Sequence, residues 1–291
     1  MTTQTALRED DHRSAIGRVE TRSERMGPAR VAAMAAVLDL DDAPVEGGAL
    51  PPGWHWLFFN PAVRRSELGS DGHPRRGGFL PDVALPRRMW AGGRLRYHAP
   101  VPVGAQAEKT SEILDVVSKS GRAGNLVFVT VRHSIAVGGA LCIEEEQDIV
   151  YREAPAPDAP KPSPSAAPAN ADRSVEVVPD PVLLFRYSAL TWNGHRIHYD
   201  HPYATGEEGY PDLVVHGPLI ATLLQGFAAE SRPDERLVEF TFRGMAPLFV
   251  GQSFKLESAP GQDGKLDLWA RGPDGELAMK AEAAFGTGVA P

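Results

Sequence analysis

Cysteine, long apolar runs and excess positive charge are all scarce in this chain of 291 residues. Cys142 is its single cysteine, so an internal disulfide is excluded, as is usual in a reducing cytoplasm. No run of 18 apolar residues occurs, so we expect no membrane span. The formal net charge of −8 argues against a general nucleic-acid partner. The N-terminus has early acidic residues and no apolar stretch, which is atypical of secretory and transit peptides. We therefore expect a cytoplasmic protein.

Several catalytic signatures are missing as well. The sequence has no G-x-S-x-G elbow, no P-loop and no dinucleotide fingerprint in a supporting context. These absences argue against a serine hydrolase of that type, a P-loop nucleotidase and a nicotinamide-dependent enzyme. We expect no cofactor.

The chain is long enough for two domains, at roughly 100–200 residues each. Residues 154–172 are rich in Pro and Ala and almost free of large apolar side chains, which predicts a semi-extended linker. This gives an N-terminal domain over 1–153, a linker over 154–172 and a C-terminal domain over 173–291.

The two sides of this linker resemble each other. RYHAPVPVG at 96–104 and RGMAPLFVG at 243–251 both fit R-x-x-A-P-[VL]-x-V-G. Each is followed by an alternating run and then by a hairpin, which turns at Gly138-Gly139 in the first half and at Pro273-Asp274-Gly275 in the second. A chance match of nine residues is the alternative, but the shared order of elements favours an internal duplication.

Each half also contains a helical pattern. The first is PARVAAMAAVLDL at 28–40, and the second, at 218–231, is apolar nearly all round and must be buried. Period-2 alternation at 125–135 and 237–243 predicts strands. One helix followed by antiparallel strands in each half predicts an α+β protein with a tandem hotdog fold, in which each sheet wraps around a central helix.

The densest polar cluster precedes the second helix, at residues 186–219, and includes NGHRIHYD at 193–200. It resembles the motif of MaoC-like enoyl-thioester hydratases. The matching residues are Thr191, Ile197, His198, Asp200, Tyr203, Ala204, His216 and Gly217. The NGHRIHYD form is similar to type 2 hydroxyacyl-thioester dehydratases and to mesaconyl-C4-CoA/itaconyl-CoA hydratases. GWHWLFF at 53–59 and RRMWAGGRLRYHAPVPVG at 87–104 resemble their FAS1-like dehydratase domain.

This resemblance implies roles for particular residues. His198 is the expected acid/base, since imidazole titrates near neutral pH. Gly217, at the start of a helix, is the implied oxyanion donor. The family's pattern has Asp where this chain has Asn193, and an amide cannot ionise, so we expect Asn193 to orient water or His198.

Other polar residues of the motif are expected to support the site: Asp200, His195, Tyr203 and His216. We expect Asp200 to cap a turn or to fix the tautomer of a histidine. Tyr203 and Tyr210 are expected to pack, and His195 and His201 have a surface role as an alternative. His195, His198 and His201 do not share one helix face and have no thiolate nearby, so we expect no metal.

An arginine-rich stretch stands out against the negative net charge. Eight arginines lie between Arg64 and Arg96, opposed by three acidic residues. We expect Arg87, Arg88 and Arg94, with Trp90 beside them, to bind the phosphates of CoA or an acyl carboxylate. A solvated surface loop is the alternative. The aromatic residues of 53–59 are expected in the core, or in the wall of an acyl pocket.

The sequence therefore predicts a hydro-lyase that adds water to a short 2-enoyl thioester, or removes it. The expected substrate class is a C4-dicarboxylic acyl-CoA, such as mesaconyl-C4-CoA or itaconyl-CoA, with CoA as part of the substrate. The second half would carry catalysis, while the first shapes the substrate site without catalysing. The alternatives are a 3-hydroxyacyl-carrier-protein dehydratase, a hotdog thioesterase and a non-catalytic acyl-CoA binder. Homo-oligomerisation is compatible with the sequence.

Overall fold

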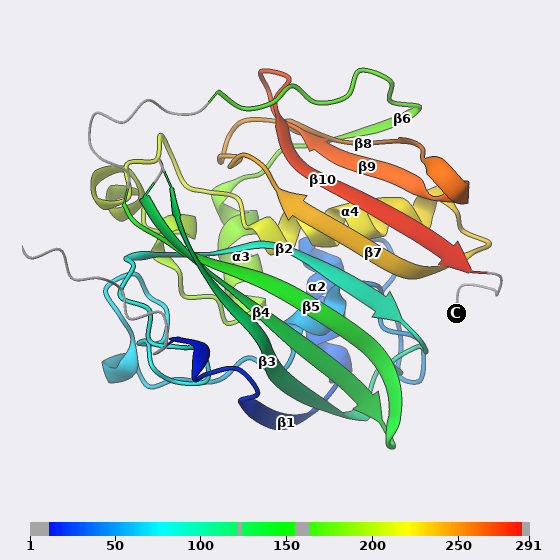
Figure 1. Cartoon of the computed structure of the whole chain (residues 1–291). Helices are drawn as coiled ribbons and strands as arrows, with labels where there is room; N and C mark the ends of the chain where they lie inside the picture. The colour runs from blue at the N-terminus through cyan, green and yellow to red at the C-terminus, as the bar shows by residue number, and fades with distance from the viewer. Residues whose placement is uncertain (1–11, 122–123, 155–162, 287–291) are drawn as a thin grey trace, which may run out of the picture.

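A ten-stranded antiparallel sheet dominates the computed structural model, which describes residues 12–121, 124–154 and 163–286. The first half supplies β1 (Val19–Arg25), β2 (Arg87–Tyr97), β3 (Gln106–Gly121), β4 (Gly124–Val137) and β5 (Ala140–Arg152). The second half supplies β6 (Arg173–Val177), β7 (Arg236–Gly244), β8 (Phe254–Pro260), β9 (Leu266–Arg271) and β10 (Leu277–Gly286). The order is β1-β3-β4-β5-β2-β7-β10-β9-β8-β6, so β2 and β7 join the two halves edge to edge (Figure 1).

The strand order is symmetric about the β2–β7 pair. Each strand of the first half has a counterpart at the equivalent position of the second: β1 with β6, β3 with β8, β4 with β9 and β5 with β10. The two copies of R-x-x-A-P-[VL]-x-V-G begin at the ends of β2 and β7 and lead into β3 and β8. Both glycine-containing turns join the expected hairpins, β4–β5 and β9–β10. The predicted duplication is confirmed by this arrangement.

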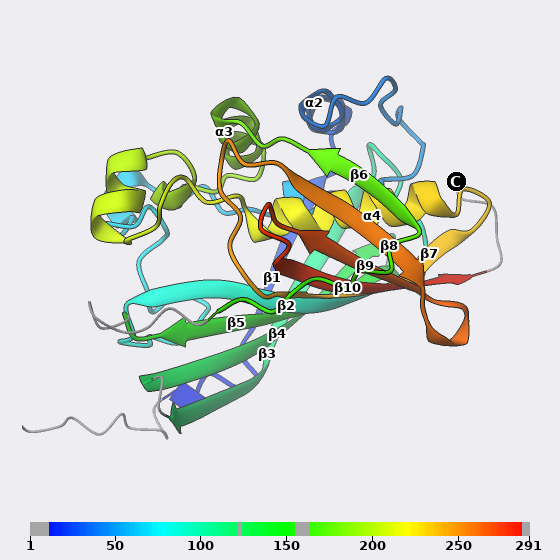
Figure 2. The ribbon, with the colours of Figure 1, turned by 90° about the horizontal axis from the view of Figure 1, so that it is seen from above.

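Helix α4 (Gly217–Ser231) is the central helix of the second half and packs on β7, β8, β9 and β10. Leu219, Leu224 and Phe227 are buried against the sheet, as its apolar sequence predicts. Helices α2 (Pro28–Val37) and α3 (Pro181–Leu190) contact each other. Helices α2, α3 and α4 lie on the same side of strands β2 and β5 (Figure 2).

Helix α2 follows β1 just as α3 follows β6, so α2 is the counterpart of α3. Our expectation that α2 is the central helix of the first half is therefore wrong. The place that α4 takes in the second half, just before β7, is held in the first half by loops and by the short helical turns η1 (Trp54–Leu57) and η2 (Arg65–Glu67). Pro51, Pro52 and Pro61 flank η1 and prevent a longer helix there.

The two halves share one main core. It contains Met34 of α2, Leu95 of β2, Leu224 of α4 and Phe240 of β7. A smaller core lies within the first half, where Ile113, Val129 and Tyr151 of β3, β4 and β5 are buried together. The aromatic residues of 53–59 are in the main core, as expected.

A buried carboxylate fixes η1 against the first-half sheet. Glu145 of β5 accepts hydrogen bonds from His55 Nε2 at 3.1 Å, Trp56 Nε1 at 2.9 Å and Gln147 Nε2 at 2.9 Å. Burial raises the pKa of Glu145, but the hydrogen bond and charge of His55 more than offset this, and the pKa falls to about 2. Glu145 is therefore ionised and satisfied by donors on several sides.

Replacing this carboxylate should destabilise the fold. Glu145→Ala leaves the buried donors of His55 and Trp56 without an acceptor, so we expect the free energy of unfolding to fall by about 3–5 kcal/mol. Urea denaturation measures it. The matched control is Glu146→Ala on the same strand, where partly exposed ion pairs with Arg94 and Arg132 are lost at a cost of about 1 kcal/mol or less each. Equal losses in both variants would contradict this role of Glu145.

The segment 154–172 is only partly as predicted. Residues 155–162 lie outside the described residues, as does the tail 1–11. Residues 165–168 are not a free linker, because Leu277 N donates to Ser165 O and Ala167 N donates to Gly275 O. Ala167 is buried with Ala259 and Trp269, since a small alanine side chain fits where a larger one would not. No helix in the described part of the chain is long and apolar enough to cross a membrane.

Candidate active site

The short turn η3 (Arg196–His198) carries the central histidine of the site. His198 Nδ1 lies 2.7 Å from the carbonyl oxygen of Val214. A carbonyl only accepts, so Nδ1 carries the proton and Nε2 keeps its lone pair. The His198 ring stacks on His216 with 3.6 Å between centroids. The exposed fraction is 7% for His198 and 0% for His216, so of these two it is His198 that can meet a ligand.

Burial sets the protonation state of His198. It lowers the pKa from 6.5 to about 4, against the opposing effect of the Val214 bond and with a small contribution from His73. His198 is therefore neutral at physiological pH. A neutral imidazole with a free Nε2 is suited to take a proton from water.

The lowered pKa of His198 predicts how the activity depends on pH. His198 acts as a base only when it is unprotonated, so activity is present above its pKa and lost below it. We expect kcat/KM to stay level from neutral pH down to about 5 and to fall near pH 4, where the pKa of His198 lies. Initial rates across this range measure it, with circular dichroism to show that the enzyme stays folded. An acid limb centred near pH 6.5 would contradict this environment.

The N-terminus of α4 lies beside His198. His216 is the N-cap residue and its Nε2 lies 2.8 Å from Ser188 Oγ. Gly217 is the first helical residue, so its N–H has no acceptor within the helix. A Cβ built on Gly217 would meet nothing within 4 Å, which leaves open space at this end of the helix. The helix terminus can thus offer an N–H to a negatively charged oxygen.

Asn193 and Asp200 hold the turn around His198. Asn193 Oδ1 accepts a hydrogen bond from His195 N at 3.0 Å. Asp200 pairs with Arg196 at 2.7 Å and caps Tyr203 N at 3.2 Å. The turn-capping role expected for Asp200 is confirmed. The alternative that Asp200 fixes the tautomer of His198 is wrong, because Val214 does so.

The remaining motif residues pack or face outward. Tyr203 lies under the Arg196 guanidinium, 4.1 Å from its carbon to the ring centroid, and its hydroxyl donates to Glu208. Tyr210 contacts Phe249. His201 is exposed and lies 3.6 Å from Asp212. His201 thus does not join His195 and His198.

Sequence reasoning missed two residues of the first half, Asp71 and His73. Asp71 Oδ2 lies 3.0 Å from His73 Nδ1. The ring centroid of His73 lies 4.2 Å from that of His195, which in turn lies 5.5 Å from that of His198. The signal in the sequence is Asp-Gly-His at 71–73, which lies within the arginine-rich stretch and matches no motif of the second half.

Asp71, His73 and His195 form a convergent group. Each offers one polar atom, and these atoms lie within 4.8 Å of one another. Side chains of these types could bind a cation or a water molecule. Burial raises the pKa of Asp71, but the hydrogen bond and charge of His73 more than offset this and hold that pKa well below its usual range. Asp71 is thus ionised and already bonded to His73.

The three candidate arginines lie in different places. Arg88 is close to the histidines: burial is the main cause of the lowered pKa of His73 and of His195, and the charge of Arg88 adds to it in both. Arg87 pairs with Glu208, 3.3 Å from Nε to the carboxylate. Arg94 is on the exposed side of β2 and is paired with Asp148 and Glu146 at 2.8 and 3.0 Å. This placement argues against Arg94 as a substrate ligand.

Trp90 belongs to an aromatic cluster at the β2–β7 junction. The centroid of its ring lies 5.0 Å from that of Trp56 and 5.6 Å from that of Phe242. Its Nε1 donates a hydrogen bond to Gly92 O. Trp90 therefore packs between the two halves.

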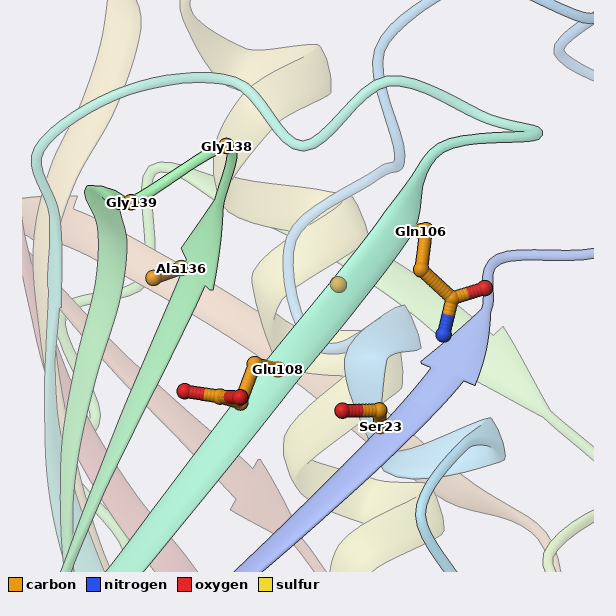
Figure 3. Close-up of a pocket in the computed structure, with 7 residues that line it drawn as sticks. Ser23, Gln106, Glu108, Ala136, Gly138 and Gly139 are labelled. Carbon is orange, nitrogen blue, oxygen red and sulfur yellow. The ribbon is translucent and has the colours of Figure 1, made fainter.

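A separate hollow lies at the edge of the first-half sheet, over β1, β3, the end of β4 and the β4–β5 turn (Figure 3). It is lined by Ser23, Gln106, Ala107, Glu108, Ala136, Gly138 and Gly139. None of the predicted site residues lines it, so it is distinct from the histidine group.

The strand order, repeated on either side of the β2–β7 pair, defines a double-hotdog fold. The chain is similar to the MaoC-like dehydratase of Phytophthora capsici, with a TM-score of 0.68, 12% identity and coverage of 97% of this chain and 98% of that one. A Mycobacterium tuberculosis protein described as having a double hotdog fold gives a TM-score of 0.58 at 15% identity, covering 93% and 96%. The predicted α+β double-hotdog fold is confirmed.

The sequence comparisons identify the family. Residues 53–250 match the family hydroxyacyl-thioester dehydratase type 2. The chain is 50% identical over 275 residues to the mesaconyl-C(4)-CoA hydratase of Chloroflexus aurantiacus, covering 93% of this chain and 96% of that protein. This chain belongs to the hydroxyacyl-thioester dehydratase type 2 family, as its sequence motif predicted.

Proposed function

We propose that this protein is a hydro-lyase that hydrates mesaconyl-C4-CoA, or a closely related C4-dicarboxylic enoyl-CoA. The observation that carries the proposal is the neutral, buried His198 with a free Nε2 beside the N-terminus of α4. The similarity to the Chloroflexus aurantiacus enzyme over nearly the whole chain supports the substrate.

The chemistry follows from these positions. Hydration requires that water oxygen bonds to Cβ and that a proton reaches Cα. His198 Nε2 takes the proton from water, and negative charge then develops on the thioester oxygen. The Gly217 N–H, at the positive end of the α4 dipole, stabilises that charge. The proton on His198 completes the addition at Cα.

A comparison of thioesters tests the proposal. Purified enzyme is assayed with mesaconyl-C4-CoA, itaconyl-CoA, crotonyl-CoA and a 3-hydroxyacyl-carrier-protein, by loss or gain of enoyl-thioester absorbance. We expect the highest kcat/KM for a C4-dicarboxylic CoA ester. A preference for the carrier-protein thioester would instead support the dehydratase of fatty-acid synthesis, and binding without turnover would support a non-catalytic binder.

Arg88 is the arginine that we expect to contact the substrate. Arg88→Ala should raise KM at least about tenfold, the effect of a lost charge-assisted contact worth about 1.5–3 kcal/mol. The matched control is Arg94→Ala on the same strand, which should keep wild-type kinetics because its guanidinium is paired with Asp148 and Glu146. If Arg88 binds the acyl carboxylate, its loss will affect mesaconyl-C4-CoA far more than crotonyl-CoA. Wild-type kinetics in both variants would show that neither arginine contacts the substrate, and would favour the alternative that the arginine-rich stretch is a solvated surface loop.

Two further expectations stay predictions. We propose a cytoplasmic location, based on the single cysteine. A homo-oligomer is compatible with this fold, and size-exclusion chromatography with light scattering would measure the assembly.

A further inference from the structure

The site lacks the carboxylate that the hydratase pattern has five residues before the catalytic histidine. Asn193 stands there, and its Oδ1 is bonded to the backbone of His195. A second polar group is still needed, because water attacking Cβ must be oriented as well as deprotonated. The group must lie beside His198 and must be able to accept a hydrogen bond.

A carboxylate does reach the neighbouring His195, but it comes from the other half of the chain. The loop between η2 and β2 runs across to the NGHRIHYD segment. Arg196 N donates to Asp71 O at 2.9 Å, and Arg196 Nη1 donates to Ser70 O at 2.9 Å. Gly72 is packed so closely on Gly194 that a Cβ on it would lie 1.9 Å from the Gly194 oxygen. These contacts fix the loop against the turn that carries His195 and His198.

We propose that His73, held by Asp71, is a catalytic residue contributed by the first half, and that with His195 it binds the water that His198 activates. Asp71 is then a positioning residue. This inference rests on the proposed hydratase function and replaces the view that the first half takes no part in catalysis.

The geometry suits a shared water molecule. Asp71 occupies Nδ1 of His73, which leaves Nε2 as an acceptor. The ring centroids of His73 and His195 lie 4.2 Å apart, so one water can contact a nitrogen of each ring, since each hydrogen bond to it spans about 2.8 Å. The His195 ring contacts both neighbours, with its centroid 4.2 Å from that of His73 and 5.5 Å from that of His198, so a water held at His195 is close to the His198 ring.

The step balances without any other reactant. One O–H bond of the water breaks, and its proton passes to His198 Nε2 as the oxygen bonds to Cβ. The electron pair of the C=C bond moves to Cα and the thioester oxygen. The proton on His198 then passes to Cα. The acceptor nitrogen of His73 takes a hydrogen bond from the second O–H of the water, and the neutral His195 ring donates its N–H to the water oxygen; both rings end the cycle unchanged.

The surroundings of His73 keep it a neutral acceptor. Burial lowers the pKa of His73, the Asp71 hydrogen bond raises it, and the charge of Arg88 lowers it again. The titratable and charged groups that act on His73 or are acted on by it are Asp71, Arg88, His195, His198 and Glu208.

Variants of His73 and Asp71 test the proposal with mesaconyl-C4-CoA as substrate. We expect His73→Ala to lower kcat by about 100-fold with little change in KM, the order of loss when a reacting group is misplaced by about 1 Å. Asp71→Asn should lower kcat about tenfold or more, as does loss of a carboxylate that orients a histidine. Added imidazole should restore part of the rate of His73→Ala, because the side chain it replaces is 23% exposed. His73→Gln, close in size, serves if the alanine variant folds poorly.

Glu67→Gln in η2 and His201→Ala in the motif segment are the controls and should keep wild-type kinetics. Wild-type kcat in the His73 variants would overturn the inference while leaving the hydratase proposal intact. A loss only in KM would also overturn it. So would loss of wild-type activity on treatment with a chelator and its recovery with a divalent cation, because the group would then be a cation site. If the wild-type enzyme itself fails to hydrate the thioester, the proposed function fails and the inference falls with it.

Discussion

His198→Ala is expected to lower kcat by at least about two orders of magnitude, the contribution of a general acid/base. The variant removes a ring that has a free Nε2, a tautomer fixed by the Val214 carbonyl and a stacking contact with the His216 ring. Steady-state hydration of mesaconyl-C4-CoA measures the loss. KM should change little, since CoA contacts are not altered.

The control for this variant lies three residues further along the same segment. His201 is exposed, and its Nε2 lies 3.6 Å from the Asp212 carboxylate, so His201→Ala should behave as the wild type. A near-normal rate in His198→Ala would remove His198 from the chemistry and with it the proposed mechanism. An equal loss in His201→Ala would show that the segment is sensitive to any substitution.

Gly72→Ala should also cost much of the activity, although Gly72 bears no functional group. Its φ is +88°, which disfavours any residue with a Cβ, and the added Cβ would collide with the backbone oxygen of Gly194. Arg196, two residues after Gly194, donates hydrogen bonds to the backbone oxygens of Ser70 and Asp71. The collision therefore cannot be relieved without breaking these bonds. The loop must then move and displace Asp71 and His73. A displacement of about 1 Å can cost on the order of 100-fold in turnover.

Gly78→Ala, in the same loop, is the matched control. A Cβ on Gly78 meets nothing within 4 Å, so its kcat should stay at the wild-type value. Both variants should be compared at the same substrate concentrations and with their unfolding midpoints measured. A wild-type kcat in Gly72→Ala would show that close docking of the first-half loop is not needed for catalysis.

Much of the fold could be predicted because its signals are local. Alternation at 237–243 buries Phe240 and Phe242, and the repeated R-x-x-A-P pattern marks the same corner in both halves. The short strands β1 and β6 and helix α3 were not predicted. Five residues of β6 have little periodicity to detect, and its exposed pattern resembles a loop. The edge-to-edge joining of the two sheets depends on the pairing of β2 with β7, which no local pattern specifies.

The site residues also fall into those that local sequence patterns reveal and those that they do not. His198, His216 and Gly217 lie within one stretch of the chain, so the spacing of the motif reveals them together. Asp71 and His73 are more than 100 residues away in sequence and reach His195 only through the docking of a long loop. The side-chain bond of Asn193 could not be foreseen either, because an Asn can cap a turn or face a ligand with the same sequence.

The central claim is that this protein adds water across the double bond of an enoyl thioester. The most direct test is to incubate the purified enzyme with mesaconyl-C4-CoA in oxygen-18 water and to analyse the products by mass spectrometry. The account predicts an intact CoA thioester that has gained one labelled water, with the label in a new hydroxyl group. Release of free CoA with the label in a carboxylate would show thioester hydrolysis and would contradict the account, as would recovery of unlabelled, unchanged substrate.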